Sequence, residues 1–320
     1  MKKDSTSLFT PYIDEMLDFK VCLGYERKTY ESFLNDFSRY CAKYYPIEEC
    51  LTKELVLAWC MRRPSESPSG FRRRIIVVRE FAKYMESIGQ ESYILPSCFA
   101  GGRVTFTPYI FSDEELATFF SESDSMELNR RSPYRHVILP VMLRMIYFCG
   151  LRPNEGREIQ KNDVNLNDGV LFIRKNKSHR ERYVPMSEDM RNLCVSYNEK
   201  LRFFAPESEF FFPNTIGIPY SAKWLTRQFL GIWEKIRNNQ CPKRARVYDL
   251  RHRFATTVMM QWLNDGADLY AKLPYLSTYM GHSQFSNTAY YIHLLPENLL
   301  HSPGMDWESF SELIPEVESW

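Results

Sequence analysis

Residues 247–256 read Val-Tyr-Asp-Leu-Arg-His-Arg-Phe-Ala-Thr, and residues 280–293 read Met-Gly-His-Ser-Gln-Phe-Ser-Asn-Thr-Ala-Tyr-Tyr-Ile-His. Together they place Arg251, His282 and Tyr291 in one small structural unit. An arginine offers a planar fork of donors that matches phosphate oxygens, a histidine exchanges a proton near neutral pH, and a tyrosine can serve as a covalent nucleophile. This residue set suits a phosphate, if the rest of the chain supplies a second cation, an acid and a DNA-sized surface.

Length and composition predict a globular protein of two domains. The chain has 320 residues, of which 44% are hydrophobic and 25% are charged, and this length is comfortable for two domains that each bury a core. A net charge of +1 does not by itself indicate a nucleic-acid-binding protein. Charge is nevertheless clustered: basic residues gather at 62–63, 72–74, 174–182 and 243–253, and acidic residues at 112–127 and after 297.

The cysteine pattern indicates neither a metal site nor a disulfide framework. Eight cysteines are scattered along the chain without a Cys-x-x-Cys pair. No cofactor is expected. Because no run of about 18 uncharged apolar residues occurs, we expect no membrane segment, and we expect a reducing, cytoplasmic setting.

Helical periodicity predicts a bundle in residues 1–96. Apolar positions recur at helical spacing from 7 to 45 with a break at Gly24, and again over 52–61 and 69–88. The last of these helices carries Arg72, Arg73 and Arg74, which form either a solvated basic face or a face that contacts phosphates.

Residues 97–108 lack periodicity, contain two adjacent glycines and are expected to be a linker. A second domain, 109–295, is predicted to be mostly helical with a small sheet, which makes the fold class mainly α with a minor β part (α+β). Its helices are expected at 136–149, 187–204, 221–238 and 247–263, its β-hairpin at 169–175 and 181–185, and a connector after 263. Apolar spacing in 296–320 predicts a tail helix that packs on its own domain or docks on a second copy.

Two residues of this domain have open interpretations. Arg152 follows a buried helix and precedes Pro153, so it is either a capping arginine paired with Glu155 or a catalytic cation. Lys177 lies in the hairpin turn, where a lysine is usually only solvated.

Five motifs in order resemble those of the tyrosine recombinases, the phage integrase family. The resemblance covers most of residues 137–293, and the bundle before the linker resembles the family's SAM-like core-binding domain. Each motif alone is weak, but the order and spacing of the five are highly specific. They are Gly-Leu-Arg-Pro-Asn-Glu (150–155), Lys-Ser-His-Arg-Glu-Arg-Tyr-Val-Pro (177–185), Tyr-Asp-Leu-Arg-His-Arg-Phe-Ala-Thr (248–256), Met-Gly-His-Ser (280–283) and Tyr291.

The resemblance implies a role for each matching position. The family's two catalytic arginines fall on Arg152 and Arg251, its hairpin lysine on Lys177 and its Gly-His histidine on His282. The nucleophile falls on Tyr291 and not on Tyr290, because the family places it nine residues after that histidine.

One position departs from the family pattern. Tyr248 stands where a histidine is usual, which leaves the role of that position open; His252 and Glu155 are candidates for supporting roles. The implied function is site-specific DNA recombination through a 3′-phosphotyrosyl intermediate. The alternatives are a type IB topoisomerase and a catalytically impaired DNA-binding relative.

The implied partners are double-stranded DNA and further recombinase subunits. We expect a tetramer on DNA, built from copies of this chain or shared with related recombinases. The DNA-contacting residues are predicted to be Arg72, Arg73, Arg74, Lys243, Arg244 and Arg246.

Overall fold

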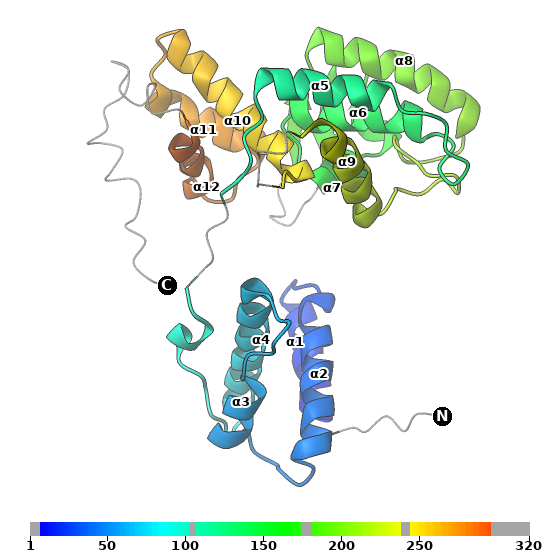
Figure 1. Cartoon of the computed structure of the whole chain (residues 1–320). Helices are drawn as coiled ribbons and strands as arrows, with labels where there is room; N and C mark the ends of the chain where they lie inside the picture. The colour runs from blue at the N-terminus through cyan, green and yellow to red at the C-terminus, as the bar shows by residue number, and fades with distance from the viewer. Residues whose placement is uncertain (1–6, 103–106, 175–180, 238–243, 296–320) are drawn as a thin grey trace. The chain divides into compact units, whose positions relative to one another are not determined.

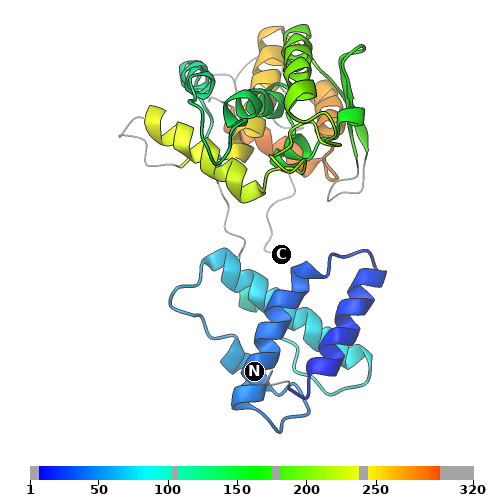
Figure 2. The ribbon, with the colours of Figure 1, turned by 90° about the vertical axis from the view of Figure 1, so that its right-hand side faces the viewer.

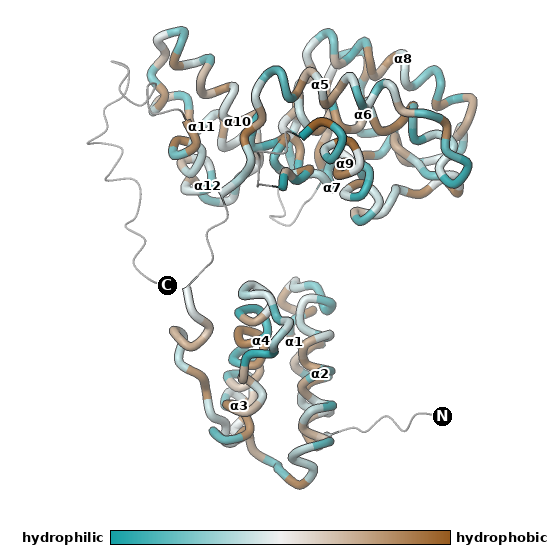
Figure 3. Tube along the Cα trace, in the orientation of Figure 1, coloured by the Kyte–Doolittle hydropathy of each residue, from teal (hydrophilic) through white to brown (hydrophobic). Residues whose placement is uncertain are grey.

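The computed structural model describes residues 7–102, 107–174, 181–237 and 244–295. The chain divides into two compact units between residues 106 and 107, and each unit is described by itself (Figure 1). Polar and apolar positions alternate along the helices of both units (Figure 3), as expected for helices that each bury one face.

The first unit is a helical bundle. Its third and fourth helices begin where the sequence supplies a cap: the Thr52 hydroxyl accepts from the Leu55 amide at 3.4 Å, and the Ser67 hydroxyl accepts from the Gly70 amide at 3.1 Å. Its core is aromatic, with the Phe37 ring 5.4 Å from that of Trp59. The helices are α1 (Thr10–Cys22), α2 (Lys28–Tyr44), α3 (Lys53–Trp59) and α4 (Pro68–Ser87), followed by the 3-10 turn η1 (Ser97–Ala100).

The second unit is built around α6 (Arg135–Phe148), which is apolar on most of its surface and packs against helices on several sides. Those neighbours are α5 (Asp113–Asp124), α7 (Pro153–Arg157), α8 (Glu188–Phe204) and α10 (Val247–Asn264), and α9 (Ala222–Ile236) packs on α5. α5 begins with a capping box that joins Ser112 and Glu115, and α7 begins directly after Arg152, where Pro153 marks the helix start.

A small antiparallel sheet lies against the end of this helical core. The predicted hairpin is present as β2 (Val170–Ile173) and β3 (Arg182–Pro185), and β1 (Val164–Asn165) adds a short edge strand in the order β1-β2-β3. Leu171 pairs with Val184, and both are fully buried. In Figure 2 the sheet lies beside α11, which packs against β3.

The connector expected after residue 263 is a helix, so that prediction was wrong. The segment is α11 (Leu269–Met280), and the Asp268 carboxylate caps it by accepting from the Tyr270 amide at 2.9 Å. Pro274 lies inside the helix and obscured it in the sequence. The helix is followed by α12 (Ser286–Ala289) and the 3-10 turn η3 (Tyr290–Leu294).

These last elements have a small core of their own. Side chains from α10, α11 and the 286–295 segment form a hydrophobic cluster separate from the main core of the unit, and Tyr291 belongs to it. Of the helices in the described ranges, none is long and apolar enough to cross a membrane.

Candidate active site

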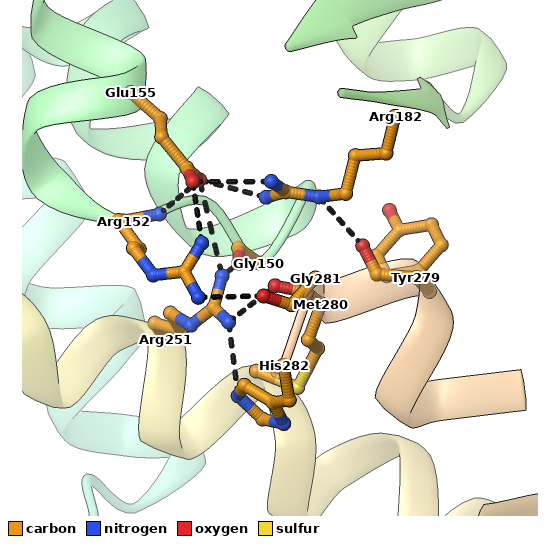
Figure 4. Close-up of polar contacts among 9 residues, drawn as sticks. All are labelled: Gly150, Arg152, Glu155, Arg182, Arg251, Tyr279, Met280, Gly281 and His282. Atoms are coloured by element: carbon orange, nitrogen blue, oxygen red, sulfur yellow. Dashed lines mark hydrogen bonds and ion pairs between the residues drawn. The ribbon is translucent and has the colours of Figure 1, made fainter. Parts of the chain in front are cut away.

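Three arginines from three different elements converge on one glutamate (Figure 4). Arg152 precedes the first residue of α7, Arg182 opens β3 and Arg251 lies in the second turn of α10. The glutamate, Glu155, lies in α7, and its side chain is only 5% exposed. The start of α7, the start of β3 and the second turn of α10 thus place three arginines that are far apart in the sequence around one carboxylate.

Glu155 binds two of these arginines through both carboxylate oxygens. Oε1 accepts from Nη1 of Arg152 at 2.7 Å and from Nη1 of Arg182 at 3.1 Å. Oε2 accepts from the Arg152 amide at 2.9 Å and from Nη2 of Arg182 at 2.7 Å. Burial alone would raise the pKa of this carboxyl, but the hydrogen bonds and charge of Arg182, with smaller effects of the Arg152 amide and Arg251, lower it to about 2. Glu155 is therefore ionised at neutral pH.

The same arginines also hold the last carbonyls of α11. The Tyr279 carbonyl accepts from Nε of Arg182 at 2.8 Å, the Met280 carbonyl from Nη2 of Arg251 at 2.6 Å, and the Gly281 carbonyl from Nη2 of Arg152 at 2.7 Å. Carbonyls at a helix C-terminus lack partners within the helix. Each of these three receives a guanidinium donor instead, so the segment that leads into His282 is fixed by the cation cluster.

Arg251 is the most deeply buried member of the cluster, at 0% exposure. Besides the Met280 carbonyl, it donates to the Gly150 carbonyl at 2.6 Å and to Nε2 of His282 at 3.1 Å. Its Nε is buried and has no hydrogen-bond partner among the described residues. Burial lowers the pKa of Arg251, but a guanidinium remains charged at neutral pH. Within the described ranges, one buried cationic donor therefore remains without an acceptor.

His282 is held between Arg251 and Thr288. Its Nδ1 lies 2.7 Å from the hydroxyl of Thr288, which is fully buried. Burial and the positive charges of Arg251, Arg152 and Arg182 lower the pKa of His282 to about 3, so the ring is neutral at pH 7. Since Arg251 can only donate, Nε2 accepts and Nδ1 carries the hydrogen that Thr288 accepts.

The two adjacent tyrosines lie in different environments. Tyr291 is 2% exposed, and its ring stacks on that of His282 with centroids 6.0 Å apart. Burial raises the pKa of Tyr291 to about 12, although the charge of Arg251 opposes this shift. Tyr290 is 37% exposed. Contact with the cation cluster thus favours Tyr291, in agreement with the spacing in the sequence.

His252 and Tyr248 extend this row of rings. The His252 ring centroid lies 5.4 Å from that of Tyr291 and 5.0 Å from that of Tyr248, which is half-buried. Burial and the charges of Arg246 and Arg251 lower the pKa of His252 to about 4, so it too is neutral at pH 7. Its buried Nδ1 has no hydrogen-bond partner within the described ranges.

Comparison with known proteins places this arrangement in a family. Residues 117–298, more than half of the chain, match the phage integrase family. The chain belongs to this family. An integrase/recombinase of Sinorhizobium fredii, y4rE, is 29% identical over 283 residues, which is 88% of this chain and 90% of that protein. The predicted family and the enzyme class, a tyrosine-type DNA recombinase, are thereby confirmed.

Two solved structures share the fold of this recombinase. The XerH site-specific recombinase bound to palindromic difH substrate aligns with a TM-score of 0.63 at 19% identity, covering 88% of this chain and 80% of that one. The Tn1549 transposon integrase in complex with a circular intermediate DNA aligns with a TM-score of 0.65 at 15% identity, covering 89% of this chain and 95% of that one. The predicted mainly helical fold with a small sheet is confirmed.

Arg182 and Thr288 belong to the site, but the sequence motifs assign neither of them a role. Arg182 lies at the end of a basic stretch, yet its side chain is 7% exposed and bonded to Glu155. Alternation along β3 carries the signal, because residues two apart share a face and Val184 is buried. Lys177 lies outside the described residues.

The predicted DNA-contacting residues of α4 need a correction. Arg74 is 1% exposed; its Nε and Nη2 each lie 2.7 Å from a carboxylate oxygen of Glu66, and it also donates to the carbonyls of Trp59 and Met61. It is a buried structural residue and cannot reach a phosphate from this position. Arg73 is exposed, and Arg72 donates to the Gly101 carbonyl.

The second predicted DNA-contacting group is only partly described. Arg244 and Arg246 are exposed, and Arg246 also donates to the Asp249 carboxylate at 3.0 Å, which caps the start of α10. Lys243 and the tail, 296–320, lie outside the described residues. Among the described residues, no group of three or more His, Cys, Asp or Glu side chains could hold a metal ion.

Proposed function

We propose that this recombinase is site-specific and cleaves one DNA strand through Tyr291, forming a 3′-phosphotyrosyl intermediate that a 5′-hydroxyl later reverses. The observation that carries the proposal is the excess of positive charge beside Tyr291. Among the described residues, Arg152 and Arg251 share the carboxylate of Glu155 with Arg182, and the buried Nε of Arg251 has no partner. A phosphodiester would neutralise part of this charge.

In the proposed step, the phenolic oxygen of Tyr291 attacks phosphorus, a Tyr–O–P bond forms and the bond from phosphorus to the deoxyribose 5′-oxygen breaks. Arg152 and Arg251 bind the non-bridging oxygens and stabilise the charge that develops there; preorganised donors of this kind each contribute about 3–4 kcal/mol. Reversal by a 5′-hydroxyl conserves the ester bond, so neither ATP nor a metal is required.

Two protons must move in this step. The Tyr291 phenol, with its raised pKa, is protonated at neutral pH, so its proton has to pass to a base. We assign that role to neutral His252, which lies beside Tyr291. Tyr248, four residues earlier in the sequence, replaces the histidine that is usual in the family. The departing 5′-oxygen takes a proton from an acid, for which Lys177 is the family candidate.

We assign the phosphate hydrogen bond to His282. In the described state its Nε2 accepts from Arg251. Donation to a phosphate oxygen therefore requires Nε2 to gain a hydrogen when DNA binds. The negative charge of a phosphate oxygen would offset the positive charges of the surrounding arginines and favour a hydrogen on Nε2.

The DNA and the assembly belong to the same proposal. Both solved structures with this fold hold DNA, and the exposed Arg73 and Arg244 are positioned on basic segments of the two units. We propose that residues 1–96 form a core-binding domain, that 109–295 form the catalytic domain, and that the 296–320 tail is exchanged within a tetramer on DNA. Integration or excision of a mobile element, or a related recombination, is the expected role.

A nicked suicide substrate tests the chemistry. The recombinase is incubated with a duplex that carries its cognate site, identified by mapping bound DNA, with a nick placed so that the cleaved 5′-end diffuses away. We expect a covalent adduct that is lost in Tyr291→Phe and retained in Tyr290→Phe. Absence of an adduct from the unaltered protein on the site it binds would support a catalytically impaired relative.

Substrates with intact cognate sites, one of them supercoiled, separate the topoisomerase alternative. A type IB topoisomerase reseals the original strand and works alone, whereas the proposed recombinase joins strands from two duplexes. We therefore expect recombinant product and a multimeric complex from intact sites. Relaxation of supercoiled DNA by a monomer without recombinant product would favour the topoisomerase.

A further inference from the structure

We propose that Arg182 is a positioning residue for the cleavage step: it aligns the phosphate-binding arginines and the turn that carries His282. The inference rests on the proposed function, because it assigns Arg182 a part in the same reaction. Arg182 acts through Glu155 and through the end of α11, and it is not proposed to contact DNA.

The contacts of Arg182 use all three nitrogen atoms of its side chain. Nη1 and Nη2 bind the two carboxylate oxygens of Glu155 at 3.1 and 2.7 Å, and Nε binds the Tyr279 carbonyl at 2.8 Å (Figure 4). The side chains of the ion pair are 7% and 5% exposed, so solvent screens the interaction little. Only a planar fork satisfies a carboxylate and a carbonyl at once in this way.

The turn after α11 is shaped around this guanidinium. Gly281 has a φ of +64°, and a Cβ at this position would lie 2.9 Å from Nη1 of Arg182 and 3.1 Å from its Cδ. A side chain would therefore both strain the backbone and displace the arginine. The bare backbone of Gly281 allows β3 and the turn before His282 to pack closely.

Each contact of Arg182 leads to a proposed catalytic group in one further step. Glu155, which Arg182 holds by both oxygens, in turn binds Arg152. The Tyr279 carbonyl, which Arg182 also holds, directly precedes the Met280 and Gly281 carbonyls bound by Arg251 and Arg152. Loss of Arg182 would leave Glu155 free to turn toward its remaining partners and would release the end of α11.

The position of Arg182 in the chain adds a third connection. It opens β3, and β2 ends at Ile173, so the segment between the two strands contains Lys177. Arg182 thus holds the start of β3, five residues after the proposed acid in the sequence.

The test compares Arg182→Lys with Arg174→Lys. Both arginines flank the same hairpin segment and form an ion pair with an acid, but Arg174 is exposed and pairs with Asp163 at 2.7 Å, away from Glu155. Three quantities are measured for each full-length variant: the melting temperature, the affinity for the mapped cognate duplex, and the single-turnover rate of adduct formation on the nicked duplex at saturating protein.

We expect Arg182→Lys to bind DNA within about threefold of the unaltered protein and to form the adduct about 100-fold more slowly, the loss typical of a displaced catalytic group. Arg174→Lys should change the rate less than about threefold, since the Arg174 side chain is more than half exposed and the lysine keeps a cation beside Asp163. An Arg182→Lys rate within about threefold of the unaltered rate would overturn the proposal, as would a rate loss explained entirely by weaker DNA binding.

A second variant and the result for the unaltered protein distinguish the remaining outcomes. If Arg182→Lys does not fold, Arg182→Gln is measured in the same way, and failure of both to fold would assign Arg182 to stability alone and overturn the proposal. If the unaltered protein forms no adduct, the proposed function itself fails. An adduct from the unaltered protein with no effect of Arg182→Lys overturns only the positioning role.

Discussion

Each of the two units contains buried arginine that is bonded to glutamate, and the two sites differ in the ratio of arginines to glutamates. In the first unit, Arg74 and Glu66 form a one-to-one pair, with Nε and Nη2 of the arginine each 2.7 Å from a carboxylate oxygen. In the second unit, Glu155 binds Arg152 and Arg182 directly, and Arg251 lies 4.0 Å away. Three guanidinium groups there share one carboxylate.

We interpret this difference as that between a structural ion pair and a proposed phosphate-binding cluster. A buried charge that lacks a counter-charge is costly, so a matched pair is the stable arrangement within a fold. An excess of buried cations is tolerated where a ligand of opposite charge neutralises it. We therefore expect the ratio of cations to carboxylates among the described residues, and not the burial of arginine alone, to mark the site of this recombinase.

The largest expected effect is on the excess cluster. Arg251→Lys keeps one charge but loses the fork that holds Gly150, Met280 and His282. We expect the single-turnover rate of adduct formation to fall about 1,000-fold, as for the loss of a buried transition-state donor. The melting temperature should fall less than in the Arg74 variant below. A cleavage rate within about tenfold of the unaltered rate would contradict the assignment.

Substitution in the Arg74–Glu66 pair should lower the stability of the protein and leave the cleavage rate unchanged. Arg74→Met leaves the Glu66 carboxylate without its partner, and we expect the free energy of unfolding of the first unit to fall by about 3–5 kcal/mol. Urea denaturation measures this change. The double variant Arg74→Met/Glu66→Met should recover much of the loss, and the rate of adduct formation by folded, DNA-bound protein should be unchanged. A specific loss of cleavage would instead give Arg74 a part in the reaction.

A smaller difference is expected on acidification. Residues 1–106 contain no histidine, whereas the second unit holds His252 and His282 with pKa values lowered to about 4 and about 3. Unfolded histidine, with a pKa near about 6.5, binds more protons than the folded form below that pH. The free energy of unfolding of the second unit is therefore highest above about pH 6.5 and falls as the pH approaches the pKa of the folded histidine. For His252 the loss is roughly 3 kcal/mol.

Hydrogen exchange measured from pH 7 down to pH 4.5 distinguishes the two units. Protection of α10 should decline across this range while that of α4 stays nearly constant. His252→Gln should flatten the decline in α10. Glu155, with a pKa lowered to about 2, adds stability above the ordinary carboxyl pKa that is lost only in stronger acid, between about pH 4.5 and 2. Equal loss of protection in both units would contradict this account.

The sequence was sufficient for the site motifs because each combines a local signal with a chemical residue. Arg152 is marked by the Gly150 stop and Pro153, and Tyr291 by its distance from His282. Ser112, followed by acidic residues, has the pattern of a helix cap, whereas the cap at Ser67 lies two residues before the predicted start of its helix at residue 69. Their meeting point around Glu155 was not predictable, because it depends on contacts between residues more than 100 positions apart, such as Arg152 and Gly281.

The missed features have identifiable causes. Pro274 interrupts the helical signal of α11, although a helix tolerates it there once both ends are packed. Arg74 was assigned to the surface by its charge, yet it shares helical spacing with Val78, Phe81 and Met85, all of which are buried. Arg182 shares a strand face with Val184. For Arg74 and Arg182, the spacing from buried neighbours predicts a buried side chain, whereas the charge of the side chain predicts an exposed one.

The Thr288 hydroxyl has a consequence for how the site changes state. A hydroxyl can accept from a protonated Nδ1 or, by rotating, donate to a bare one. The hydrogen bond of 2.7 Å to His282 can therefore persist whichever ring nitrogen carries the hydrogen. Thr288 lies three residues before Tyr291 on the same segment. If His282 changes tautomer in the proposed reaction, the segment that carries Tyr291 can therefore keep its hydrogen bond to the histidine in both forms.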